Sequence, residues 1–237
     1  MILKINGAVC QPHLLMLRSE KMDLLSWIQQ MTEGCGLTIA LFMVTIVLSI
    51  PLGLVLTFLY TGKNRIIKKI VGFYILIMRG TPLMLQIFFV YFGLPFIPAV
   101  GKYLVISDRF TAGAIAFVLN YGAYFAEIFR GGILSVDKGQ YEAAKVLGIS
   151  EMQTKFKIVM PQMFRISLPS VANETVILLK DTALITAIGL SDLLKVTTNI
   201  VNRTTNVSAY IVAAAFYLVL SYLLTILFKK LEKKFAF

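Results

Sequence analysis

The stretch GQYEAAKVLGISEMQTKFKIVMPQ, residues 139–162, is a polar segment inside an otherwise apolar chain. Its first part, GQYEAAKVLG, has the composition of a short helix, with Glu142 near its start and Gly148 at its end. A second predicted helix, EMQTKFKIVM, follows, and we expect Pro161 to stop it. Helix signals alone would fit two solvated helices that only join their neighbours, so the surrounding chain and the residue spacing must decide.

The surrounding chain has the composition of an integral membrane protein. Of its 237 residues, 58% are hydrophobic and 15% are charged, and the mean hydropathy is +0.80. An ordinary soluble domain is less apolar. The two cysteines, Cys10 and Cys35, and the single histidine, His13, have no metal-type spacing. We therefore expect no metal site, no bound cofactor, and no zinc or thiol enzyme.

Five segments are predicted to cross the bilayer, since a helical crossing needs about 20 apolar residues. They are residues 36–60, 70–96, 111–129, 166–190 and 209–228. The first is uncharged and contains Pro51, whereas the second carries Arg79 and the interruption Gly80-Thr81-Pro82. The predicted fold is an all-α membrane protein with five transmembrane helices and a loop, residues 131–161, between the third and the fourth.

Basic residues gather in residues 63–69, residues 130–165 and residues 229–234. Lys and Arg concentrate on the cytoplasmic side of membrane proteins. This pattern predicts an outside N-terminus, an inside C-terminus and a cytoplasmic loop at 139–162. The net charge of +11 is then a signal of topology, and we expect the lipid bilayer, not nucleic acid, as the surroundings of this chain.

The polar segment carries a spaced motif. Glu142-Ala143-Ala144 is followed after three residues by Gly148 and, nine residues later, by Ile158-Val159-Met160-Pro161. This resembles the EAA signature of ABC importer permeases, with Met160 where that signature has Leu. Residues 76–95, 124–148 and 178–194 also resemble permeases of polar amino acid importers, the group that serves histidine, glutamine and arginine. The resemblance covers residues 23–237.

The resemblance implies a type I importer permease in the bacterial cytoplasmic membrane, paired with a second copy or a homologue. It also implies two cytosolic ATPase subunits, which hold ATP and Mg, and an extracytoplasmic amino acid-binding protein. Glu142, Ala143, Ala144 and Gly148 are expected to form the coupling helix that contacts the ATPase. The chain has no G-x-x-x-x-G-K-[ST] loop, so we expect no enzyme activity of its own.

Polar side chains within the predicted spans are candidates for the substrate pathway, because a charge inside a bilayer needs a partner or a water-lined path. They could guide a polar amino acid, and the acids among them, together with Glu174, suit a basic one such as arginine. The alternatives are a structural kink at Gly80-Thr81-Pro82, and pairing with a neighbouring span or at the cytoplasmic interface for the others. The candidates are Arg79, Thr81, Gln86, Asn120, Tyr124, Glu127, Lys180 and Asp181.

Two further questions concern the mode of transport and the start of the chain. An ion-coupled secondary amino acid transporter that works without an ATPase is the alternative function, although internal repeats are absent from the sequence. Residues 1–22 form a leader that lacks the unbroken apolar core of a secretory signal. We hypothesise that this leader is not translated, that translation begins at Met22, and that residues 23–237 form one permease domain.

Overall fold

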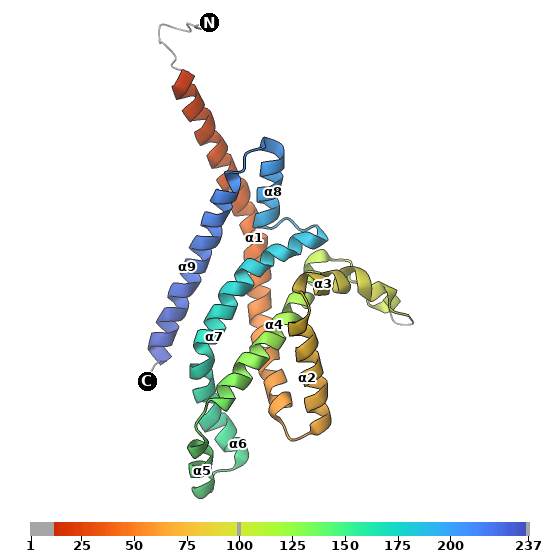
Figure 1. The fold of residues 1–237 in the computed structure, drawn as a ribbon, viewed down its shortest axis with the longest axis vertical. Coiled ribbons are helices and arrows are strands. Elements are labelled where there is room, and N and C mark those ends of the chain that lie inside the picture. The colour runs from red at the N-terminus through yellow and green to blue at the C-terminus, as the bar shows by residue number, and fades with distance from the viewer. Residues whose placement is uncertain (1–11, 99–100, 236–237) are drawn as a thin grey trace.

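The computed structural model describes residues 12–98 and 101–235, and every regular element within them is a helix (Figure 1). In chain order these are α1 Pro12–Thr61, α2 Arg65–Gly80, α3 Leu83–Phe88, the π-helix η1 Phe89–Gly93, the 3-10 helices η2 Leu94–Phe96 and η3 Gly101–Tyr103, α4 Arg109–Leu134, α5 Lys138–Val146, α6 Glu151–Gln153, the π-helix η4 Thr154–Val159, α7 Met160–Asp181, the 3-10 helix η5 Thr182–Ile188, α8 Leu193–Thr204 and α9 Ala209–Phe235. The all-α prediction is confirmed.

Helix α1 is longer than the predicted first span. Its 50 residues extend over about 75 Å at about 1.5 Å per residue, more than twice the hydrocarbon thickness of a bilayer. The part before residue 36 packs through Trp27, Met31 and Cys35 against α8 and the start of α9. Residues 1–11 of the expected leader lie outside the described residues, and residues 12–22 continue α1.

The second predicted span, 70–96, is not one continuous helix. Helix α2 ends at Gly80, and α3 begins at Leu83 after a change of direction of 108°. Pro82 has no N–H and restricts the residue before it to extended backbone, and Thr81 has φ −121° and ψ 146°. The interruption seen in the sequence is therefore a sharp corner rather than a kink.

The prediction that Pro161 stops the second helix of the polar segment is wrong. Residues 151–181 run on as α6, η4 and α7. Pro161 lies in the first turn of α7, and the turn before it is π-helical, with the N–H of Met160 bonded to the carbonyl of Lys155. The wider turn and the position at a helix start accommodate a residue that has no N–H.

Three described helices, Asp23–Thr61, Arg109–Leu134 and Ala209–Phe235, are long and apolar enough to cross a membrane, and the bent pair α2 and α3 raises this number to four. Helix α7 is more polar. It continues as η5 to Ile188, which covers most of the predicted fourth span. The five predicted spans thus correspond to α1, the bent α2–α3 pair, α4, α7 with η5, and α9.

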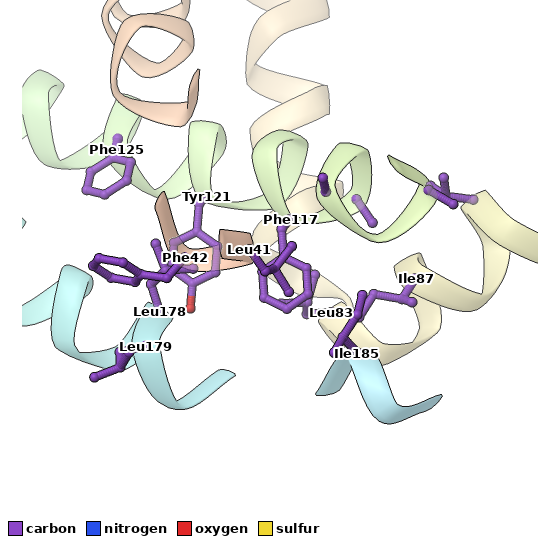
Figure 2. Close-up of a cluster of buried hydrophobic side chains, with 14 of the residues drawn as sticks. Leu41, Phe42, Leu83, Ile87, Phe117, Tyr121, Phe125, Leu178, Leu179 and Ile185 are labelled. Carbon is purple, nitrogen blue, oxygen red and sulfur yellow. The ribbon is translucent and has the colours of Figure 1, made fainter. Parts of the chain in front are cut away.

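Helix α4 lies at the centre of the bundle, between α1, α3 and α7. Figure 2 shows Tyr121 of α4 directed toward Leu178 of α7, and Phe117 of α4 beside Leu41 of α1 and Leu83 of α3. Phe42, Phe125 and Leu179 belong to the same cluster. All of these side chains are buried. Because α4 is covered by other helices on most of its circumference, it is the element against which the others are positioned.

The two ends of the bundle carry different elements (Figure 1). The α1–α2 turn and the α5–α6 segment lie at one end, where Lys63 Nζ is 2.6 Å from Glu151 Oε2. Helix α8 lies toward the other end, where Arg203 donates to Gln30 of α1 over 3.1 Å. The two basic loops predicted to share one side of the membrane are therefore neighbours.

Close contact between α1 and α4 depends on Gly53. A Cβ at this position would lie 2.6 Å from Phe125 Cβ and 3.0 Å from the backbone nitrogen of Ala126. One helical turn later, Thr57 Oγ1 lies 2.9 Å from the carbonyl oxygen of Ala126. Glycine allows the backbones to approach, and the threonine then bonds across the contact.

We predict that Gly53→Ala destabilises the protein by about 1–3 kcal/mol, the usual cost of overpacking, and lowers its thermal unfolding midpoint in detergent. Gly36→Ala is the matched control in the same helix, because a Cβ there meets nothing within 4 Å. The control should be neutral or stabilising by up to about 1 kcal/mol, since alanine favours helix. Equal midpoints for the two variants would contradict the proposed contact.

Candidate functional site

The EAA segment forms a short helix, α5, whose two ends are capped. Asp137 precedes the helix, and its carboxylate accepts from the N–H of Gly139 at 2.6 Å. At the other end the N–H of Ile149 bonds to the carbonyl of Ala144 at 2.9 Å, and the N–H of Gly148 bonds to Lys145 at 3.1 Å. This is a Schellman cap. Gly148 has φ +72°, a conformation that other residues adopt only with strain.

The faces of α5 differ in exposure. Ala144 is 2% exposed and packs inward, whereas Glu142 and Ala143 face outward. The side chains of Val146 and Leu147, one turn further on, are 87% and 74% exposed. Of the two motif alanines, only Ala143 is available to a partner. Val146 and Leu147 are large apolar residues that the motif did not single out, and exposed apolar side chains that cluster in this way are typical of interaction sites.

The turn that follows α5 leads into the capped start of α6. Ser150 and Gln153 form a capping box at the start of α6, and Thr154 is buried. The pair between Lys63 and Glu151 is almost fully exposed and so adds little stability. The carboxylate of Glu151 nevertheless has a lowered pKa, because Lys63 donates a hydrogen bond to it.

Thr81, Gln86 and Asn120 meet at the corner between α2 and α3. Gln86 Nε2 donates to the carbonyl of Met78 at 2.9 Å and to Thr81 Oγ1 at 2.8 Å. Asn120 Nδ2 donates to the same Met78 carbonyl at 2.8 Å and to Gln86 Oε1 at 3.0 Å. These side chains bind carbonyls near the end of α2, where the helix has no further N–H groups to offer.

Arg79, Tyr124 and Glu127 form a second group beside this corner. The guanidinium of Arg79 lies 5.4 Å from the ring centroid of Tyr124, and its Nη1 is 3.9 Å from Glu127 Oε1. Arg130 donates from Nε to Glu127 Oε2 at 2.9 Å and pairs through Nη2 with Oε1. Two guanidinium groups thus share one carboxylate. The group carries a net positive charge, and the side chain of Arg79 is 41% exposed.

Lys180 and Asp181 point to different neighbours. Asp181 accepts a hydrogen bond from the hydroxyl of Tyr121 at 2.7 Å, and the ring of Tyr121 is fully buried in α4. Lys180 instead lines a groove with Tyr217 and Ser221 of α9. Tyr121 was not among the sequence candidates. The feature that could have pointed to Tyr121 is that a buried tyrosine hydroxyl needs a hydrogen-bond partner.

The eight pathway candidates therefore do not form one site. Three of them hold the corner, three form a charged group beside it, and the last two diverge. Among the described residues, no group of three or more His, Cys, Asp or Glu side chains could hold a metal ion. The chemistry available to the charged group is charge recognition by Arg79, Glu127 and Arg130.

Comparison with known proteins gives the geometry a family context. Residues 49–237 match the family described as binding-protein-dependent transport system inner membrane component. The chain is 37% identical over 203 residues to a putative glutamine transport system permease protein of Rickettsia conorii, which covers 85% of this chain and 91% of the relative. It is 36% identical to the arginine transport system permease protein of Bacillus subtilis, over 85% and 90% of the two chains.

Solved structures agree with these relatives. The crystal structure of an amino acid ABC transporter with histidines superposes with a TM-score of 0.81 at 29% identity, over 90% of this chain and 97% of the other. A methionine ABC transporter in an inward-facing conformation superposes with a TM-score of 0.69 at 16% identity, which shows the shared fold alone. These comparisons give no support to the ion-coupled alternative. The chain belongs to the family of binding-protein-dependent transport system inner membrane components, the permeases of ABC importers.

Proposed function

We propose that this chain is the permease subunit of an ABC importer for a polar amino acid, and that it docks its ATPase through α5. The observation that carries the proposal is the outward face of α5, where Val146 and Leu147 are exposed next to Glu142 and Ala143 of the EAA motif. The names of the relatives, which are glutamine and arginine transport permeases, support the substrate class.

The proposed assembly contains two ATPase subunits that hold ATP and Mg, a second permease copy or homologue, and an extracytoplasmic amino acid-binding protein. The N-terminus lies outside and the C-terminus inside. The adjacency of the α1–α2 turn and α5 supports this orientation, because both segments are basic. Residues 23–237 form the permease domain. Intact-mass measurement of the natural protein would test whether translation begins at Met22.

We place the substrate pathway beside Arg79, Tyr124 and Glu127. Arg79 is half-exposed and only weakly tied to Glu127, at 3.9 Å, so its guanidinium can exchange that contact for a substrate carboxylate. Glu127 can accept the ammonium of the same zwitterion, at the expense of one of its arginine partners. Thr81, Gln86 and Asn120 support the corner that positions Arg79. Asp181 extends the polar lining along α7, whereas Lys180 faces α9. A basic substrate such as arginine remains a proposal that rests on Glu174 and Asp181 of α7, because the group around Arg79 is itself positively charged.

The central experiment measures ATP hydrolysis in proteoliposomes that contain the chain and its candidate ATPase, with and without cargo-loaded binding protein. Stimulation by loaded binding protein is the expected result. Uptake that follows an ion gradient, with no ATPase association, would restore the ion-coupled alternative.

We predict that Leu147→Ser weakens ATPase binding by on the order of tenfold or more, since burial of a leucine side chain contributes about 1.5–3 kcal/mol. Binding of the ATPase to the chain in nanodiscs measures this effect. Val207→Ser is the matched control, because Val207 is 70% exposed in the turn between α8 and α9, away from α5. Wild-type binding by the Leu147 variant would contradict docking through this face.

We expect Gly148→Val to lower cargo-stimulated ATP hydrolysis, because a residue with a Cβ in the left-handed conformation costs about 1–2 kcal/mol. A β-branched side chain would therefore favour opening of the Schellman cap of α5. Gly148→Asn is the control, since asparagine tolerates this conformation, and it should retain most of the stimulation. If both variants behave alike, the backbone conformation at Gly148 is not what coupling requires.

Two variants distinguish a residue of the proposed substrate pathway from a residue that stabilises the corner between α2 and α3. Arg79→Gln should lower amino acid uptake while the thermal midpoint stays near that of the wild type, because an exposed ion pair contributes little stability. Gln86→Leu removes hydrogen bonds at the corner, which should lower the free energy of unfolding by about 1–3 kcal/mol. The thermal midpoint of this variant should therefore fall. Arg65→Gln, at the other end of α2, is the charge-matched control. Unchanged uptake by the Arg79 variant would remove Arg79 from the pathway.

A further inference from the structure

One cavity combines an apolar floor with a basic rim. It has a volume of ≈ 510 Å³ and is enclosed by the end of α1, the end of α4, helix α5 and the turn η4. Its lining includes the apolar side chains of Phe58, Ile133 and Met160, called the floor below, and the basic side chains of Lys145 and Lys155, called the rim. A volume of this size lies within the range of small-molecule sites, about 300–1,000 Å³.

The charge of the rim is not cancelled within the chain. Glu151 also lines the cavity, but its carboxylate is already paired with Lys63 at 2.6 Å. Within residues 12–98 and 101–235, neither Lys145 nor Lys155 forms an ion pair. Lys155 Nζ lies 4.6 Å from the ring centroid of Phe58, so this ammonium sits where the apolar floor meets the rim. The two lysines together favour an anion.

The position of the cavity indicates the kind of anion. Phe58 lies three residues before the end of α1 at Thr61, and Ile133 lies next to the end of α4 at Leu134. Phe58 is near the end of the predicted span 36–60 and Ile133 follows the predicted span 111–129, at the side that carries the basic loops. This position corresponds to the level of the lipid head groups.

The other large cavity provides a contrast. It has a volume of ≈ 580 Å³ and lies between α1 and α9, where residues such as Ile39 and Phe216 line it without any charged side chain. Such a groove accommodates apolar chains but offers nothing to a head group. Of these two cavities, the one beside α5 combines basic and apolar lining.

We propose that this cavity binds an anionic phospholipid of the inner leaflet, with its phosphate between Lys145 and Lys155 and an acyl chain over Phe58, Ile133 and Met160. Basic pockets between helices on the cytoplasmic side are suited to such head groups. The bound lipid would hold α5 against the ends of α1 and α4. The inference depends on the membrane location of the chain and not on its cargo.

The test uses the full chain in nanodiscs with Phe58→Trp as a reporter in the floor. The natural tryptophan, Trp27, packs with Met31 and Leu193 in a different cluster, so the parent chain supplies the background signal. Quenching by brominated phosphatidylglycerol is compared with quenching by brominated phosphatidylcholine at equal fractions. We expect preferential quenching by phosphatidylglycerol, reduced by a factor of about five for each lysine replaced in Lys145→Gln and Lys155→Gln.

The matched control is Lys68→Gln with Lys69→Gln, which removes the same charge from exposed positions of α2 near the same end. An equal loss in this control, or no preference in the parent, would overturn the proposal in favour of general surface attraction. Displacement of the brominated lipid by soluble glycerol phosphate would assign the site to a free phosphate ester instead. Native mass spectrometry of the chain without the reporter should show phosphatidylglycerol retained, and retained less by the lysine variants.

Discussion

A polar group inside a bilayer must find its partner within the protein, and the arrangement of this bundle follows from that requirement. Pro82 turns the chain, and carbonyls at the end of α2 are then bound by Gln86 and Asn120. The hydroxyl of Tyr121 binds Asp181, and Thr57 lies against a carbonyl of α4. Helix α4 contributes to all three contacts, through Asn120, through Tyr121 and through the carbonyl that Thr57 meets. The central helix is thus the shared source of hydrogen-bond partners as well as the shared packing surface.

Close approach of the helices makes these short hydrogen bonds possible. Gly53 lets α1 approach α4 at Phe125, and Gly132 does the same toward α7, where a Cβ would lie 2.1 Å from Ser167 Oγ. Small residues at such contacts are typical of membrane helices, because packing rather than water drives their association. The buried aromatic rings of α4 then fill the space between α1 and α7 (Figure 2).

The proposed docking helix α5 is followed, after the turn at residues 147–150, by one continuous run of helix from 151 to 181. Because Pro161 does not interrupt residues 151–181, displacement of α6 by an ATPase would be transmitted along α7 to Glu174 and Asp181. The π-helical turn η4 is the one irregular element in this path, and such turns are frequent at functional sites. The same turn forms part of the wall of the basic cavity, which places the proposed lipid beside the point where α5 joins this run.

The sequence by itself determined the class of the protein, the five apolar segments and the position of the EAA motif. Hydropathy, the distribution of Lys and Arg, and the spacing from Glu142 to Pro161 are properties of the chain in order, so no tertiary contact was needed to find them. The tertiary structure alone decided what each polar residue contacts. Neighbours along a helix point in different directions, so Lys180 faces α9 while Asp181 faces Tyr121. The sequence predicted that a helix would end at Pro161, because proline disfavours the interior of a helix. In the structure the π-helical turn before Pro161 lets the helix continue.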